Sequence, residues 1–208
     1  MSARIHPTAI VEQGVTLGPG TAVWDHVHIR HSTQIGQQCI IGGKTIIAYG
    51  NQIGHRVKIN SFVYICHGVT IEDGVMIGAG TIFTNDRYPR AATADLRDLR
   101  PSEPDETTRP TLVREGATVG AGCVIGNDLV IGRFAMIGMG SLVTRSIPDF
   151  HLAMGRPARS VGCVCRCGLV IRRFEHPGNA DSGRVSCEAC GRQFELDQRR
   201  VVELDGGA

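Results

Sequence analysis

Apolar residues recur at every sixth position along most of the chain. The series runs without a break from Ile5 to Phe83, resumes at Val113 and ends at Val143, which makes twenty apolar positions. The next residue is Gly at nine of these twenty positions. A period of six matches neither an α-helix nor a simple alternating strand. It matches a triangular solenoid in which each six-residue unit, or hexad, supplies one short strand and one corner.

The pattern therefore predicts an all-β fold, a left-handed parallel β-helix of about twenty hexads. Three hexads close one coil, the apolar position points into the shaft, and parallel hydrogen bonding stacks the coils about 4.8 Å apart. Gly is the residue that best tolerates unusual backbone conformations. We therefore expect the glycines after the apolar position to relieve backbone strain at the corners.

Residues 84–112 leave the six-residue frame and are mostly polar. A segment of this length inside a compact solenoid is usually functional or disordered. We therefore expect a β-helix domain over residues 1–160, with a loop extruded at 85–112. Residues 161–208 are expected to form a small separate tail.

Residues 18 apart occupy equivalent places on successive coils, so the third position of every third hexad forms one edge of the shaft. That edge carries the polar series Gln13, His31, Tyr49, His67 and Asn85. We expect His67 and Asn85 to lie about 5 Å apart beneath the loop. An imidazole and an amide at this spacing suit an amine or a hydroxyl, and His67 is a candidate proton acceptor. The alternative is that both are ordinary solvent-facing corner residues.

Composition narrows the possible classes of function. The net charge of +2 and the aromatic content of 5% argue against a nucleic-acid-binding surface. No apolar run is long enough to span a membrane, and the first residues lack the pattern of a signal peptide. We therefore expect a cytoplasmic protein with no nucleic-acid partner and no membrane partner.

Cysteines are concentrated in the tail, which contains VCRCG at 164–168 and SCEACG at 186–191. Two cysteine pairs, each followed by Gly, are typical of a zinc ribbon, a structural site with four thiolate ligands. Such an ion would stabilise a tail too short to have its own core. The expected ligands are Cys165, Cys167, Cys187 and Cys190. Because the first pair is C-x-C, Cys163 is a competing ligand, and a redox pair or unliganded thiols are the alternatives.

Several segments resemble the hexapeptide-repeat acyltransferases, and within them the bacterial N-acetyltransferases that act on UDP-2-acetamido-3-amino-2,3-dideoxyglucuronate. The hexad frame is common to the superfamily, whereas the segments FTN-x-x-x-PRA and TLVR-x-GATVGA are more specific. The matching stretches cover nearly all of residues 5–162; they are 5–29, 56–60, 68–75, 82–91, 111–125 and 147–162.

The resemblance implies transfer of an acetyl group from acetyl-CoA to a nucleotide-linked amino sugar, in a pathway of bacterial surface polysaccharides. It also implies a homotrimer with active sites between neighbouring shafts. Acetyl-CoA would lie along the C-terminal coils and contact the segment MGRPARSVG. The expected coenzyme-binding residues are Gly138, Arg156, Pro157 and Arg159. Asn85 matches the family asparagine that orients the amine.

The resemblance is incomplete at the acceptor site. Relatives often have a carboxylate near position 67, whereas His67 is typical of a different branch of sugar N-acetyltransferases. Either His67 acts as a base here or the acceptor differs. We take His67 and Asn85 as the candidate catalytic residues. The candidate substrate-binding residues are His28, Lys58, Asn60 and Arg90.

Other functions fit parts of the pattern. A sugar O-acetyltransferase is the nearest alternative, and a non-catalytic scaffold with a zinc-ribbon docking module would bind no acetyl-CoA. A zinc hydratase of the carbonic-anhydrase type needs three histidines that converge between subunits. His26 and His67 are suitably placed for this, but Phe62 occupies the position expected for the third histidine.

Overall fold

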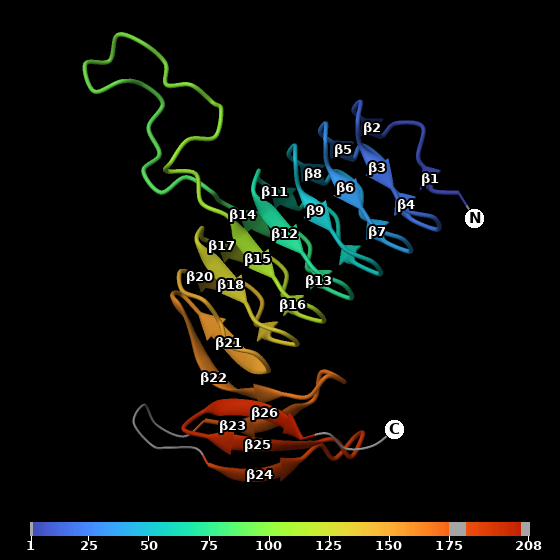
Figure 1. Ribbon diagram of the computed structural model, residues 1–208, viewed down its shortest axis with the longest axis vertical. Coiled ribbons are helices and arrows are strands. Elements are labelled where there is room, and N and C mark those ends of the chain that lie inside the picture. The colour runs from blue at the N-terminus through green and yellow to red at the C-terminus, as the bar shows by residue number, and fades with distance from the viewer. Residues whose placement is uncertain (1, 175–181, 205–208) are drawn as a thin grey trace.

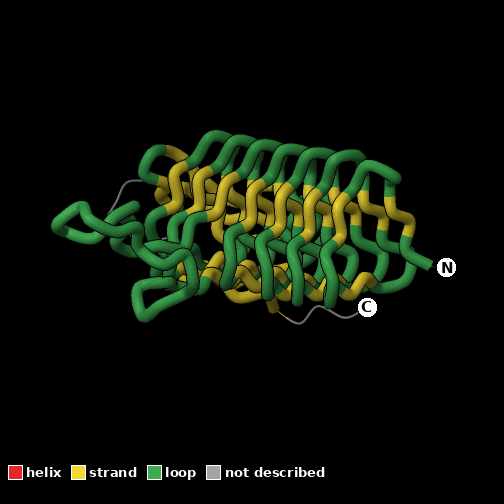
Figure 2. The backbone as a smooth tube through the Cα atoms, turned by 90° about the horizontal axis from the view of Figure 1, so that it is seen from above, coloured by secondary structure: helices red, strands yellow, loops and turns green. Residues whose placement is uncertain are grey.

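The computed structural model describes residues 2–174 and 182–204, and all regular structure in these residues is β. Short strands wind around a shaft in three parallel sheets, which we name faces A, B and C (Figures 1 and 2). Face A contains β1 (Arg4–Ile5), β4 (Ala22–Val23), β7 (Ile40–Ile41), β10 (Lys58–Ile59), β13 (Met76–Ile77), β16 (Thr118–Val119), β19 (Met136–Ile137) and β21 (His151–Gly155).

The strands of the other two faces alternate with these along the chain. Face B contains β2 (Ile10–Val11), β5 (His28–Ile29), β8 (Ile46–Ile47), β11 (Tyr64–Ile65), β14 (Ile82–Phe83), β17 (Val124–Ile125) and β20 (Leu142–Val143). Face C contains β3 (Thr16–Leu17), β6 (Gln34–Ile35), β9 (Gln52–Ile53), β12 (Val69–Ile71), β15 (Thr111–Val113) and β18 (Leu129–Ile131).

The register of the strands shows how the coils stack. Ile59 pairs with Ile77, a separation of 18 residues, so three hexads close one coil. This confirms the predicted parallel β-helix. Across the extruded loop Phe83 pairs with Ile125. The loop is therefore inserted between stacked coils without replacing a strand, and it projects from the shaft in Figure 1.

The shaft is filled by the apolar position of the hexads. Ile41, Ile59 and Ile77 are fully buried. Buried threonines add internal hydrogen bonds between coils: Thr21 Oγ1 donates to the Gly36 carbonyl over 2.7 Å and accepts from the Cys39 N–H over 3.0 Å. The polar atoms of this core are thus paired, as buried polar groups must be.

The glycines after the apolar position do not have the expected role. Gly18 lies outside the left-handed region, and a Cβ on it would lie only 2.5 Å from the main-chain nitrogen of Gln37 in the next coil. These glycines allow close approach of successive coils, so the expectation that they relieve strain is wrong. The left-handed turns lie two residues later, where residues such as Gln38 (φ 58°) are also accepted.

The C-terminal end of the shaft is covered by antiparallel strands. β21 pairs with β22 (Ala158–Val164), which pairs with β23 (Val170–Arg173). A separate sheet is formed by β24 (Gly183–Ser186), β25 (Gln193–Asp197) and β26 (Arg200–Leu204). A second apolar cluster, with Phe150 from the shaft and Phe194 from the sheet, joins the two parts.

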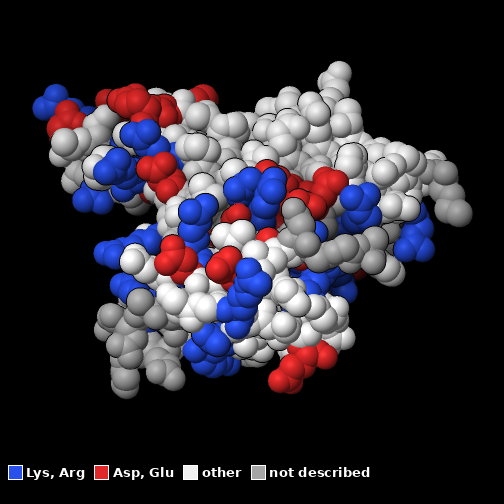
Figure 3. All heavy atoms as spheres, turned by 60° about the horizontal axis from the view of Figure 1, so that its bottom comes forward, with Lys and Arg blue, Asp and Glu red and all other residues white. Residues whose placement is uncertain are grey.

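The expected boundary between residues 160 and 161 falls within β22 and remains a prediction. Residues 175–181 and 205–208 of the predicted tail lie outside the described residues. In Figure 3 basic and acidic side chains are interspersed on the end of the molecule that carries this tail. Nothing in the described part of the chain is a helix long and apolar enough to cross a bilayer.

Candidate functional site

Both candidate catalytic residues lie on the edge between faces B and C, which we name the B–C edge. His67 follows β11 and Asn85 follows β14, the next strand along face B. Asn85 Nδ2 donates to the main-chain carbonyl of His67 over 3.1 Å. The extruded loop leaves the shaft here, and its residues join the edge in lining a cleft of about 450 Å³. The structure therefore brings these two residues together beneath the loop.

The imidazole of His67 is held by the coil before it. Its Nδ1 lies 3.0 Å from the main-chain carbonyl oxygen of Tyr49. A carbonyl oxygen only accepts, so Nδ1 carries the hydrogen and Nε2 of the neutral ring is able to accept a proton. Gly50 leaves space for the ring, since a Cβ there would lie 3.3 Å from two ring atoms. This geometry suits a general base whose tautomer is set by the main chain.

The base of the loop fixes the position of Asn85. The Arg109 N–H donates to the Asn85 carbonyl over 2.8 Å, and Asn127 Nδ2 donates to the Asp86 carbonyl over 2.8 Å. A short bridge also pairs Asp86 with Thr108 across the loop. The side-chain Nδ2 and the main-chain carbonyl oxygen of Asn85 both already make hydrogen bonds. Its side-chain Oδ1 is therefore the atom suited to accept a hydrogen bond from a substrate amine.

Cationic and aromatic side chains line the cleft. Arg30, Arg90 and Arg100 contribute guanidinium groups, and Tyr49 and Tyr64 contribute rings. The guanidinium of Arg30 lies over Tyr49, 5.1 Å from the ring centroid. The carboxylates of Asp86, Glu103 and Asp105 line it too, and Asp105 pairs with Arg100 over 3.2 Å. A cleft with this mixed lining suits a polar ligand.

Cys66 also lines the cleft, but its thiol is poorly suited to act as a nucleophile. Burial raises the pKa of this thiol to about 12. The thiolate is the nucleophilic form, and it is scarcely populated near neutral pH when the pKa is this high. Of these two neighbouring side chains, His67 is therefore the better suited to proton transfer.

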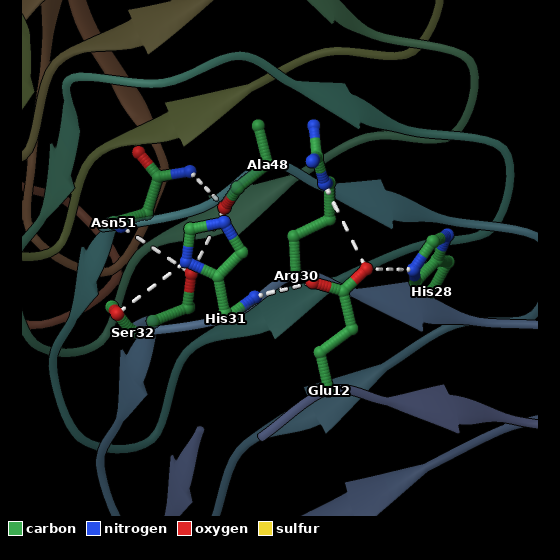
Figure 4. A network of polar contacts seen from close by, with 8 residues as sticks. Glu12, His28, Arg30, His31, Ser32, Ala48 and Asn51 are labelled. Atoms are coloured by element: carbon green, nitrogen blue, oxygen red, sulfur yellow. Dashed lines mark hydrogen bonds and ion pairs between the residues drawn. The ribbon is translucent and has the colours of Figure 1, made fainter. Parts of the chain in front are cut away.

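His28 belongs to a network centred on Glu12, outside the cleft (Figure 4). The Glu12 carboxylate accepts the His31 N–H over 2.8 Å, and its other oxygen lies 2.7 Å from His28 Nε2. The bond from the His31 main chain, followed by the contact with His28, lowers the pKa of Glu12. Arg30 Nε lies 3.8 Å from the same carboxylate. The network thus reaches the cleft through Arg30, and His28 does not line it.

Lys58 and Asn60 lie on face A and on the edge between faces A and B, which we name the A–B edge. Lys58 is exposed at the start of β10, and Asn60 is half-buried just after this strand. Neither residue lines the cleft on the B–C edge. Within one chain the structure therefore does not join them to His67 and Asn85.

The candidate coenzyme residues gather further along the A–B edge, at the hairpin of β21 and β22. The Gly138 N–H donates to the Ala153 carbonyl over 2.8 Å, which ties the last A–B corner to this hairpin. Arg156 and Pro157 form the exposed turn of the hairpin, and Arg159 is exposed at the start of β22. Face B separates this group from the cleft, so one chain does not bring the two groups together.

Comparison with known proteins identifies the repeat. The model of the bacterial transferase hexapeptide family (six repeats) matches residues 52–85. The dTDP-3-amino-3,6-dideoxy-alpha-D-galactopyranose 3-N-acetyltransferase of Aneurinibacillus thermoaerophilus is 39% identical over 94 residues, 45% of this chain and 45% of that protein. The chain therefore contains the hexapeptide repeat of these bacterial transferases over residues 52–85.

Other relatives of this hexapeptide-repeat protein match by sequence or by fold. The bifunctional protein GlmU of Synechococcus sp. (strain CC9311) is 30% identical over 152 residues, 70% of this chain and 28% of that protein. The chain thus spans less than half the length of these two relatives. The crystal structure of the BC4754 gene product of Bacillus cereus, a candidate acetyltransferase, has a TM-score of 0.58 at 22% identity and covers 79% of this chain and 86% of that chain. The structural likeness concerns the fold.

The tail of this hexapeptide-repeat protein brings four thiols together. One sulfur from each of four cysteines lies within 4.8 Å of the others: Cys165, Cys167, Cys187 and Cys190. Two of the sulfur–sulfur distances are 3.4 Å and 3.5 Å. A tetrahedral zinc ion with bonds of about 2.3 Å places its sulfur ligands roughly 3.8 Å apart. The donor set and its spacing therefore fit zinc.

The turns around these thiols explain why Gly follows each pair. The Gly168 N–H donates to the Cys165 carbonyl over 2.9 Å, and the Gly191 N–H donates to the Cys187 carbonyl over 2.8 Å. Both glycines have left-handed backbones, with φ of 92° and 74°. Cys163 is buried in β22 and is not part of the group.

A histidine cluster of the hydratase type is not found in residues 2–174 and 182–204 of a single chain. Within these ranges the four thiols form the one group of three or more potential ligands close enough to share an ion. His26 lies on the A–B edge, where its Nδ1 is 3.3 Å from Asp25, and so it does not meet His67.

Sequence reasoning gave no role to several residues of the cleft, among them Tyr49 and Arg30. It placed Tyr49 on the B–C edge without a function, and it missed Arg30. The signal for Arg30 is the same 18-residue period, because this residue shares the column of Ala48 and Cys66, one position before the polar series.

Proposed function

We propose that this hexapeptide-repeat protein is an acetyl-CoA-dependent N-acetyltransferase acting on a nucleotide-linked amino sugar. The observation that supports it most strongly is the pairing of His67 with Asn85 in a cleft beneath the extruded loop. The activity named for the Aneurinibacillus relative is of this type.

The proposed chemistry follows from the free atoms of the two residues. Asn85 Oδ1 accepts one hydrogen of the sugar amine and so orients the nitrogen lone pair towards the thioester carbonyl of acetyl-CoA. The C–N bond forms, and the amine proton passes to His67 Nε2. The C–S bond then breaks, and the CoA thiolate receives the proton from His67. The products are the N-acetyl sugar and CoA.

We propose a UDP-linked 3-amino-glucuronate as the acceptor. The guanidinium groups of Arg30 and Arg90 suit an acceptor that carries phosphate and carboxylate charges, whereas Arg100 is paired with Asp105 over 3.2 Å. Such a substrate belongs to the synthesis of bacterial surface polysaccharides, which would place the protein in the cytoplasm. The specific acceptor rests on the sequence resemblance together with this charge.

A homotrimer would complete the site. Face B presents outward apolar side chains on successive coils, with Ile46, Tyr64 and Ile82 exposed by 42%, 43% and 43%. Burial of such a stripe against a neighbouring shaft is favourable. The coenzyme residues of one subunit would then meet the cleft of the next. Lys58 and Asn60 would reach the substrate from the A–B edge in the same way.

We further propose one structural zinc ion, held by Cys165, Cys167, Cys187 and Cys190. When bound, such an ion crosslinks four thiolates and supplies no group to the reaction. The chain around it contributes two tight turns and the apolar cluster that attaches the tail to the shaft. This assigns the metal to stability and leaves the chemistry to the cleft.

The function is tested by acetyl-CoA turnover against a panel of UDP- and dTDP-amino sugars. We expect acetylation of a 3-amino sugar, with loss of about 100-fold or more in kcat for Asn85→Ala and His67→Ala. His55→Ala, at a corner outside the cleft, is the matched control and should retain activity. Absence of turnover with every amino sugar would refute the proposal.

A further inference from the structure

Three rings stack along the B–C edge at the spacing of the coils. The His31 and Tyr49 rings have centroids 5.1 Å apart and an interplanar angle of 8°, and those of Tyr49 and His67 are 4.7 Å and 25°. The residues are 18 apart, so each ring belongs to a successive coil. The candidate base is the last ring of this column.

The column is held in place from the side opposite to His67. Glu12 accepts the His31 N–H over 2.8 Å and lies 3.8 Å from Arg30 Nε. Arg30 in turn lies over the Tyr49 ring, 5.1 Å from its centroid. A cation over the face of a Tyr ring stabilises that ring by a modest amount. The Tyr49 ring is therefore held by the His31 ring, which stacks on it, and by the Arg30 guanidinium.

His67 depends on Tyr49 through two different contacts. The main-chain carbonyl of Tyr49 accepts the Nδ1–H over 3.0 Å, and the ring of Tyr49 stacks on the imidazole. The hydrogen bond selects the tautomer, but one hydrogen bond alone leaves the ring able to tilt about its side-chain torsions. The stacked ring restricts this tilt.

We propose that Tyr49 is a positioning residue, whose ring holds the His67 imidazole so that Nε2 meets the acceptor amine. This inference rests on the proposed function, because it assigns His67 the role of base. Tyr49 itself takes no proton in the reaction. An aromatic ring at position 49 is the requirement, and its hydroxyl group is not.

The kinetic test compares Tyr49→Leu with Tyr49→Phe. Tyr49→Phe keeps the ring and should retain kcat within about twofold, whereas Tyr49→Leu should lose about 10- to 100-fold in kcat with a small change in KM. His55→Leu is the matched control, since this ring lies on the edge between faces C and A, outside the cleft. Equal activity of the Leu and Phe variants would overturn the proposal.

A second readout does not depend on turnover. Nitrogen-15 NMR of the histidine rings, assigned with His67→Gln, reports which nitrogen of His67 carries the hydrogen. We expect the Nδ1–H form in the wild type and in Tyr49→Phe, and a mixture of forms in Tyr49→Leu. An unchanged His67 signal in Tyr49→Leu would contradict the positioning role. If no amino sugar is acetylated, the proposed function fails, and the NMR result still decides whether Tyr49 positions the ring.

Discussion

At the scale of single residues, the next coil determines which side chain a corner accepts. Gly18 faces the main chain of the following coil, where a Cβ would have no space. Gly80 has a left-handed backbone (φ 70°) with no heavy atom within 4 Å of an added Cβ. Both positions are glycine, but for different physical reasons: one requires close approach and the other an unusual torsion angle.

These reasons predict different costs for the same substitution. Gly18→Ala should lower the free energy of unfolding by about 3 kcal/mol, because the main chain of the next coil cannot move away from the added methyl group. Gly80→Ala should lower it by about 1 kcal/mol, since only the torsion angle is strained. Denaturant unfolding of the two variants measures this difference. A larger loss for Gly80→Ala would contradict the assignment.

At the scale of elements, the hairpin of β21 and β22 connects the proposed coenzyme site to the proposed metal site. β22 begins beside Arg159 and leads to Cys165 just beyond its end. Arg166, between two of the thiols, lies over the Phe134 ring of the shaft at 4.4 Å and makes a 2.6 Å ion pair with Glu203. The turn between Cys165 and Cys167 is thus attached to both the shaft and the tail sheet.

Metal removal should therefore affect coenzyme binding as well as stability. We expect one zinc ion per chain in the purified protein, and loss of the ion in Cys187→Ser. Chelation should lower the unfolding temperature and raise the KM for acetyl-CoA about tenfold, because β22 loses its anchor. Cys163→Ala is the control and should keep its zinc. Elemental analysis that finds no zinc in the wild type would refute the site.

His151 gives the attachment of the tail a pH dependence. Its Nε2–H donates to the Arg199 carbonyl over 2.8 Å, and burial lowers the pKa of the ring below the ordinary histidine value of 6.5. The unfolded chain then binds a proton at a pH where the folded chain does not. The contribution of His151 to the free energy of unfolding is therefore fully present above the pKa of the ring in the unfolded chain. It is lost as the pH falls from there through the lower pKa of the ring in the folded chain.

The expected result is a steeper loss of thermal stability in the wild type than in His151→Gln between about pH 7.5 and 5.5. His55→Gln, at an exposed corner, should retain the wild-type slope. The unfolding temperature measured across this range tests the effect. Parallel curves for the wild type and His151→Gln would contradict it.

At the scale of the whole molecule, the proposed trimer follows from the contrast between two faces. The outward residues of face B include Ile46 and Ile82, whereas those of face C include Gln34 and Gln52. We expect sedimentation to give three chains per particle. Ile46→Arg should dissociate the trimer by placing a charge in the apolar stripe, and Gln52→Arg should not. A monomeric wild type would contradict the assembly.

The sequence alone could predict the coil, because its six-residue period determines which residues face inward. It also predicted that His67 and Asn85 share an edge, since the 18-residue spacing is a property of the coil. The role of the glycines and the stack on Tyr49 could not be predicted, because they depend on contacts between coils. The relation of the A–B edge to the cleft would depend on the proposed trimer, which the resemblance implies but the residues alone do not.

The central claim is that a sugar amine binds between His67 and Asn85. A crystal structure of the protein with CoA and a nucleotide-linked 3-amino sugar tests it most directly. We expect the amine nitrogen within roughly 2.6–3.2 Å of both His67 Nε2 and Asn85 Oδ1. A sugar amine bound on another edge of the shaft, away from both side chains, would contradict the claim.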